Sequence, residues 1–286
     1  MPFYSMVQSF LSAYKIIAGI ISILLIATEA VLLNFILQEF HLLKSQTSLP
    51  TLIYTVLMCS FPENLFLHPV LLGNLFLIFS LKRCLDLSTN KNAISAAFDS
   101  GFLISIASFF YFPCILFLFF VWVSQLAFRS FSFREFILAF AGVCIPYLFA
   151  GVYFYWFDEL SFFWSEKILS SVSNSVTNTT HNLKSFYVLL IFLGIMFVIS
   201  VPAFFREMGK NKASIRSSFR LFLWFFVLAF LSFLIALPNS FFHFSLAAIP
   251  LSILFSNLFL NSKNVFSEII FSFLIFFIII YQMNYF

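Results

Sequence analysis

The sequence predicts an all-α protein, a polytopic bundle of transmembrane helices. Hydrophobic residues make up 62% of its 286 positions and charged residues 9%, whereas soluble domains are about 45–50% apolar and about 25% charged. Apolar runs of the roughly 20 residues that a spanning helix needs recur along the chain. Most lysines and arginines fall in every second connection between these runs, as in membrane proteins. These observations exclude soluble, fibrous and disordered classes and predict a single integral-membrane domain over residues 1–286.

The apolar runs predict about ten membrane segments. Seven runs are clear candidates for spanning helices: Ile16–Gln38, Leu65–Leu81, Phe136–Phe157, Phe186–Phe205, Leu221–Leu237, Phe241–Leu260 and Val265–Tyr285. Three runs are shorter. Leu49–Phe61 is followed by Pro62, and Phe98–Phe112 is separated from Pro113–Phe128 by a proline, which disfavours helix in the residue before it. We expect each short run to be a tilted or incomplete span, or a segment buried among other helices.

The basic residues predict the sidedness of the chain. If the connection that holds Lys82 and Arg83 is cytoplasmic and the segments alternate, 12 of the 15 basic residues fall on the cytoplasmic side. Those on the outer side are Lys15, Lys167 and Lys184. This asymmetry predicts an inner-membrane protein with both termini on the non-cytoplasmic side. It also predicts that Phe98–Phe128 is a hairpin that turns at the outer side.

The longest outer connection predicts an interfacial helix. Residues 158–169 place Leu160, Phe163, Trp164 and Ile168 on one helical face, with serines and an acid opposite. A helix that lies on the outer leaflet, with Trp164 at headgroup depth, would satisfy this pattern.

The sequence contains no motif for a nucleotide, a metal or a cofactor. It lacks the phosphate-binding glycine loops, the H-E-x-x-H motif and the C-x-x-C spacing. We therefore expect no cofactor and no metal site, and nothing in the charge pattern points to nucleic acid. The expected partner is the lipid bilayer.

Five polar residues at the predicted outer rim are candidates for catalysis. Glu63, His68, Asp158, Glu159 and His243 are acids and histidines, the residue types that act as general bases. Brought together at one membrane face, they could act on a lipid-linked substrate. Equally, Glu63 could be a helix-terminal or surface acid, and the histidines could be solvated or structural.

Two further features allow two interpretations each. Glu29 lies deep in the first span, near Asn34, and intramembrane acids are functional candidates by default. It could contact an ion or substrate, or it could join helices through a hydrogen bond. Small residues recur every four positions at Ala93, Ala97, Gly101 and Ser105, which favours close helix approach within the chain or with another subunit.

Three stretches resemble an uncharacterised family of polytopic inner-membrane proteins found in Bacteroidota. They are Leu57–Glu63, Leu71–Arg83 and Phe98–Tyr111, and Ala247–Ile253 is similar to it as well. The order of segments is also similar, more loosely, to the membrane module of GT-C glycosyltransferases. That resemblance implies transfer of sugar from polyprenyl phosphate at the outer membrane face, with an acid in the first outer loop as base. Residues 1–15 contain no Asp or Glu, so the usual catalytic loop is absent or displaced and Glu63 does not simply inherit that role. Among the rim residues of this chain, Glu63 is still the best candidate for a base.

Three hypotheses of function follow from these features. The first is an enzyme-like protein that acts on polyprenyl-phosphate-linked sugars, with Glu63 as base. The second is a non-catalytic membrane subunit that holds other membrane subunits through its small-residue hairpin. The third is a transporter that uses Glu29 and Asn34, although no paired broken helices are visible.

Overall fold

The computed structural model describes a bundle of α-helices. It describes residues 15–43, 47–89, 93–128, 132–158, 183–235, 241–261 and 264–283, and within these ranges it contains ten α-helices and no strand. The helices are α2 (Lys15–Glu39), α3 (Leu49–Cys59), α4 (Pro69–Asp86), α5 (Ala93–Phe110), α6 (Leu118–Phe128), α7 (Phe133–Trp156), α10 (Leu183–Lys210), α11 (Ala213–Ile235), α12 (Phe244–Asn261) and α13 (Asn264–Met283). Short 3₁₀ turns join some of them: η1 (Pro62–Leu65), η2 (Leu87–Thr89), η3 (Phe112–Phe117) and η5 (Phe241–His243).

Each of the ten apolar runs overlaps one described α-helix, so the all-α prediction is confirmed. Six of the described helices are long and apolar enough to cross a membrane: α2, α5, α7, α10, α11 and α12. The run Leu65–Leu81 was expected to be a clear span, but Leu65 belongs to η1 and α4 begins at Pro69. The last turns of α4 also carry Lys82, Arg83 and Asp86, which shortens its apolar part. How many of the ten helices cross the bilayer stays a prediction.

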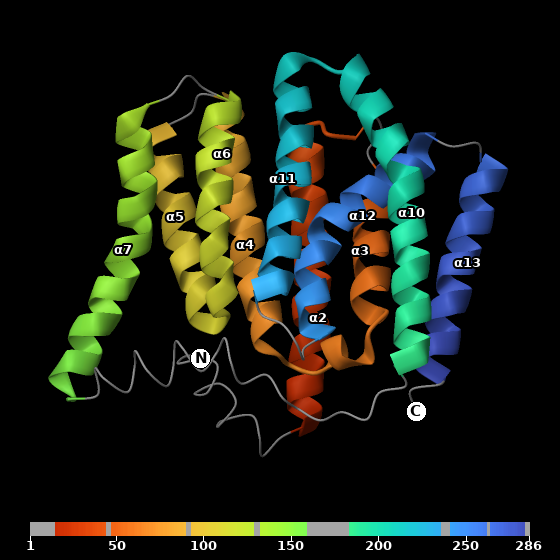
Figure 1. Cartoon of the computed structure of the whole chain (residues 1–286), viewed down its shortest axis with the longest axis horizontal. Coiled ribbons are helices and arrows are strands. Elements are labelled where there is room, and N and C mark those ends of the chain that lie inside the picture. The colour runs from red at the N-terminus through yellow and green to blue at the C-terminus, as the bar shows by residue number, and fades with distance from the viewer. Residues whose placement is uncertain are drawn as a thin grey trace.

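The helices stand side by side, with α7 and α13 at opposite ends of the row (Figure 1). At one end α5 packs along both α4 and α7, while α12 lies inside the other half against α3, α10 and α11. The short helices α3 and α6 lie among longer ones, α3 against α2 and α12, and α6 against α11 and α7. The chain turns at Tyr111 and Pro113 between α5 and α6, so the predicted hairpin is confirmed as a structure, and the side of the membrane on which it turns stays a prediction.

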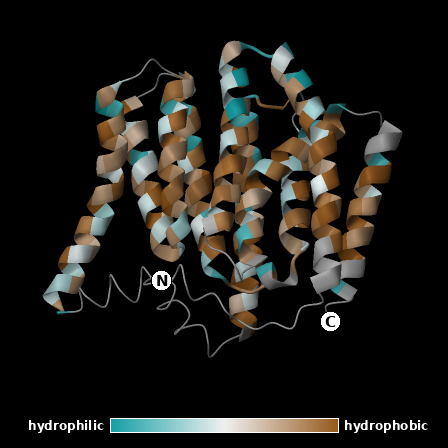
Figure 2. Cartoon of the chain, viewed as in Figure 1, coloured by the Kyte–Doolittle hydropathy of each residue, from teal (hydrophilic) through white to brown (hydrophobic). Residues whose placement is uncertain are grey.

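Hydrophobic residues predominate along the middle of most helices (Figure 2). Large hydrophobic side chains are exposed on the outside of the bundle, including Val198 at 67% and Phe149 at 70%. Water would penalise this much exposed apolar surface, whereas lipid tails solvate it. The protein is therefore a membrane protein.

The two edges of the bundle differ in charge. The upper edge in Figure 1 carries the connections α4–α5, α6–α7 and α10–α11. Lys82 lies 3.0 Å from Glu39 there, and Arg83 lies 3.4 Å from Asp99. Further basic side chains of this edge lie on α7, α10 and α11 and in their connection: Arg134, Arg206, Lys210, Lys212, Arg216 and Arg220. The opposite, lower edge carries η1, η5 and the C-terminal end of α7. The described basic side chains thus gather at one edge as expected, and which edge faces the cytoplasm stays a prediction.

The small-residue stripe of α5 packs against α7 of the same chain. A Cβ atom added at Gly101 would lie 2.1 Å from the backbone oxygen of Ala139, and one added at Gly142 would lie 2.4 Å from that of Phe98. Glycine is therefore required on both helices at this crossing. Of the two interpretations of the stripe, close packing within the chain is the one that the structure shows at Gly101.

Candidate functional site

A cluster of three buried polar side chains lies at the lower edge of the bundle. We call His68, Tyr111 and His243 the lower-edge cluster; their exposed fractions are 2%, 4% and 3%. Each lies where the sequence interrupts a helix. His68 caps the N-terminus of α4 just before Pro69, Tyr111 is the extended residue between α5 and η3, and His243 ends η5. Helix breaks thus bring together residues that lie far apart in the sequence.

Tyr111 and His243 contact each other directly, and His68 contacts Phe242, the residue before His243. The Tyr111 hydroxyl is hydrogen-bonded to Nδ1 of His243, and it lies 3.1 Å from Nε2 of the same ring. The His68 ring packs against the Phe242 ring at a tilt of 31°, with 4.6 Å between ring centroids. Nδ1 of His68 accepts a hydrogen bond from the backbone N–H of Leu71 at 3.3 Å. Its Nε2 has no hydrogen-bond partner among the described residues.

Both histidines of the cluster are uncharged near neutral pH. Burial and, to a smaller extent, the neighbouring His243 together lower the pKa of His68 to about 3. Burial also lowers the pKa of His243 to about 4. A general base works best when its pKa lies near the operating pH. These imidazoles are therefore better suited to donate and accept hydrogen bonds than to remove protons.

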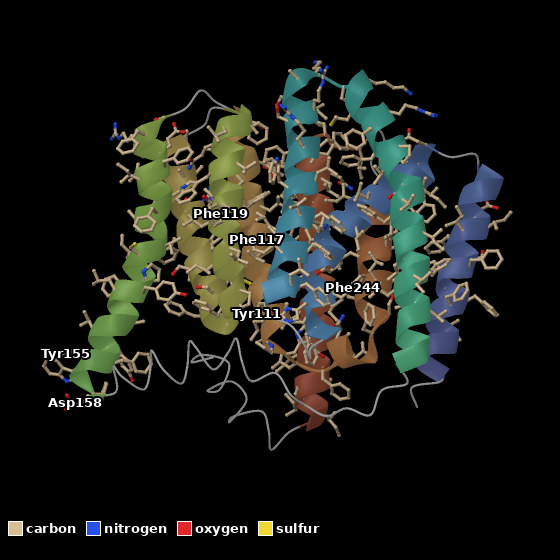
Figure 3. The ribbon with its side chains drawn as sticks, viewed as in Figure 1. Tyr111, Phe117, Phe119, Tyr155, Asp158 and Phe244 are labelled. Atoms are coloured by element: carbon tan, nitrogen blue, oxygen red, sulfur yellow. The ribbon has the colours of Figure 1, made fainter. Side chains whose placement is uncertain are left out.

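An apolar groove between α10, α11 and α12 ends at this cluster. We call it the lateral groove; its volume is about 320 Å³, at the lower end of the roughly 300–1,000 Å³ typical of ligand sites. Gly194, Phe226 and Ala247 line it from the three helices. All the other described residues that line the groove are apolar or glycine, so His243 is the one polar side chain among them. The labelled Tyr111 and Phe244 mark the lower part of this region in Figure 3.

A second buried polar group joins four helices inside the bundle. The Tyr54 hydroxyl of α3 donates to Oε2 of Glu29 on α2 at 2.7 Å. The side chain of Asn74 on α4 lies beside the Tyr54 hydroxyl, and its Nδ2 donates to the backbone oxygen of Ser245 on α12 at 3.1 Å. Glu29 therefore joins helices, which is the second of its two interpretations. A transport role for Glu29 with Asn34 stays a prediction.

The structure brings together some of the predicted rim residues and separates others. His68 and His243 lie in the lower-edge cluster. Asp158 is exposed at the end of α7, with a φ of 55°, and lies apart from Tyr111 in Figure 3. Glu63 is in η1, but its side chain lies outside the description, as does the whole of Glu159. Most of the predicted interfacial helix, including Trp164, also lies outside the described residues.

Three residues of these polar groups, Tyr54, Asn74 and Tyr111, escaped the sequence analysis. Asn74 gave a signal, because an amide inside an apolar run needs a partner. Tyr54 and Tyr111 gave none, since tyrosine is common at membrane interfaces. The described residues contain no group of three or more histidines, cysteines or acids that could hold a metal ion.

Comparison with known proteins gives a family match. The model of a family of unknown function, DUF6427, matches residues 3–286. No curated protein and no solved structure matches the chain. The family match confirms the prediction of an uncharacterised family, and it supplies no site residues.

Proposed function

We propose that this chain, which belongs to the DUF6427 family of unknown function, is a membrane protein that binds a long-chain lipid. In this proposal the lipid chain lies in the lateral groove and the lipid head lies at the lower-edge cluster. The observation that carries the proposal is that an apolar groove between three span-length helices ends at a buried histidine.

The position of the groove favours a lipid over a soluble ligand. The helices α10, α11 and α12 are each long and apolar enough to cross a membrane, so a groove between them is open to the bilayer. A lipid chain gains little by moving from bilayer to groove, because lipid tails are as apolar as leucine. Selection must therefore come from the shape of the groove and from the polar groups at its end. This combination matches a site for one kind of lipid rather than a surface for lipid in general.

The catalytic form of the proposal is glycosyl transfer on polyprenyl-phosphate-linked sugars. Glu63 is its candidate base, and its support is that η1 packs against η5, the turn that carries His243. Glu63→Gln should then abolish transfer while the amount of bound lipid stays unchanged. Unchanged transfer by this variant would remove Glu63 from the proposal and leave lipid binding intact.

The test of lipid binding is a variant that fills the groove. A Cβ atom at Gly194 meets no atom within 4 Å, so Gly194→Trp can place its ring in the groove without a backbone clash. Native mass spectrometry of protein gently extracted from its membrane should show a stoichiometric lipid on the wild type. The variant should retain at least tenfold less of it, at an unchanged Tm.

Gly209→Trp is the matched control. Gly209 lies on the same helix, its Cβ position is also open, and it is not among the groove's lining residues. This variant should keep the wild-type amount of lipid. If Gly194→Trp keeps it as well, the lateral groove is not the lipid site.

A further inference from the structure

The lower-edge cluster contains a buried hydrogen-bond donor without a partner. Nδ1 of His68 accepts the N–H of Leu71, so in the neutral ring the proton is on Nε2. Nε2 is buried and has no partner among the described residues. A buried donor that is left unsatisfied destabilises the folded protein. It requires an acceptor oxygen that the described part of the chain does not supply.

No described basic side chain lies with the cluster. The described lysine and arginine side chains belong to the upper edge, where Lys82 and Arg83 pair with acids. Nitrogen atoms project from the upper ends of α10 and α11 in Figure 3, whereas Tyr111 lies near the lower edge. The side chains of Lys15, Lys167 and Lys184, which the sequence assigns to the outer side, lie outside the description. The described end of the groove is therefore polar but uncharged.

Among the side chains that the structure describes, no cation would pair with an anion buried at this end. Burying an isolated charge costs far more than burying a hydroxyl or carbonyl group, which one hydrogen bond can satisfy. The histidines do not supply the missing charge, because burial holds the pKa of each well below neutral. A phosphate group therefore fits the cluster poorly, whereas an uncharged oxygen acceptor fits the free donor of His68.

We infer that the site selects a lipid with an uncharged head, whose hydroxyl or carbonyl oxygen accepts a hydrogen bond from Nε2 of His68. The inference rests on the lipid-binding form of the proposed function, since it names the class of lipid that the lateral groove would take. It counts against the catalytic form, whose lipid carries a phosphate. The tail follows the apolar lining toward Leu251, and the head lies beside His243 and Tyr111. Polyprenols and isoprenoid quinones share this chemistry.

A matched pair of lipids tests the charge of the head. Delipidated protein in detergent would be titrated with a polyprenol and with the polyprenyl phosphate of the same chain length, and bound lipid would be counted by native mass spectrometry. An isoprenoid quinone forms a third arm, which separates carbonyl from hydroxyl heads. We expect the polyprenol or the quinone to bind at least tenfold more tightly than the phosphate. Equal or tighter binding of the phosphate would overturn the inference.

A variant of His68 tests the donor. His68→Asn keeps an oxygen that can cap α4 but removes the Nε2 donor. It should weaken the uncharged lipid about tenfold and leave the weak binding of the phosphate unchanged. If the affinity for the uncharged lipid does not change, His68 is not its donor and the inference fails.

The two proposals fail in different ways. If the phosphate binds best and Gly194→Trp displaces it, the groove is a lipid site and the inference about the head is wrong. If no lipid responds to Gly194→Trp, the proposed function itself is wrong.

Discussion

The α5–α7 crossing and the lateral groove both contain glycine, but glycine has opposite consequences in the two places. At the crossing, Gly101 and Gly142 face the backbone of the other helix, and a Cβ atom at either would clash with a carbonyl oxygen. In the groove, Gly194 faces open space. Phenylalanines of the neighbouring helix α11, such as Phe226 and Phe230, line the groove beside it. Small residues close an interface when both helices present them. Where one helix presents glycine and the next presents large rings, the same residue leaves a space.

The α5–α7 crossing therefore has a structural role, whereas the lateral groove has the features of a binding site. The α5–α7 crossing buries small residues and leaves no volume at the two glycines, so its work is to hold α7 to the bundle. The lateral groove ends in a buried polar cluster with an unpartnered donor, which packing alone does not require. A residue type that is common in membrane helices therefore has to be judged by what stands opposite it.

The largest expected effect comes from closing the tight crossing. Gly101→Leu places a side chain where even a Cβ atom would lie 2.1 Å from the oxygen of Ala139. Overpacking costs typically 1–3 kcal/mol and more against backbone, so we expect at least about 3 kcal/mol lower stability and little folded protein. The measurement is the yield and Tm of the purified variant.

Gly151→Leu is the control for this prediction. Gly151 lies on α7 as well, and its Cβ position meets no atom within 4 Å. This variant should keep the wild-type yield and Tm. Equal losses for Gly101→Leu and Gly151→Leu would show that bulk on these helices matters, not the crossing.

The sequence predicts the helices well because hydropathy and proline positions act locally. Each of the ten runs overlaps one described helix, and the turn at Pro113 and the basic edge followed from the same patterns. The cluster could not be found this way. Tyr111 and His243 lie 132 positions apart, and hydropathy fixes the length of a helix but not its neighbours or its rotation about its axis.

The start of α4 shows a second limit of the sequence analysis. The apolar run begins at Leu65, yet the helix begins at Pro69, because His68 adopts an extended backbone and caps it. The same cap buries His68 and fixes its Nδ1 as an acceptor. The sequence therefore revealed one residue of the site, a polar residue inside an apolar run. It did not reveal which residues contact it.

An intermediate effect is expected from pH, and it concerns the groove end. The folded protein holds His68 and His243 with pKa values of about 3 and about 4, below the roughly 6.5 of a free histidine. At a pH between the folded and unfolded pKa values, the unfolded chain binds more protons than the folded protein. The two neutral rings therefore contribute their full stability above about pH 6.5, and this contribution is lost as the pH falls toward the folded pKa values. From pH 7 to 5 we expect to lose roughly 2 kcal/mol for each ring.

The pH prediction is measured by thermal unfolding in detergent across this range. His68→Asn and His243→Gln should each flatten the decline of Tm below pH 6.5. His41 is exposed, so His41→Asn serves as the control and should keep the wild-type slope. A flat wild-type profile would mean that the rings are accessible to protons in the folded protein, and the groove end would then be open to water.

The smallest expected effect distinguishes an open groove from a poorly packed interface. Gly194→Ala adds one methyl group to a helix interior where no atom lies within 4 Å. Alanine is favoured over glycine in helices by roughly 0.5–1 kcal/mol, so Gly194→Ala should be more stable than the wild type by about that much. Gly101→Ala should be less stable than the wild type, because its methyl group clashes with the backbone of α7. The readout is the shift of Tm for the two variants under identical conditions. A loss at Gly194 equal to that at Gly101 would mean that α11 closes over Gly194 in the folded protein, and no room for a lipid chain would remain.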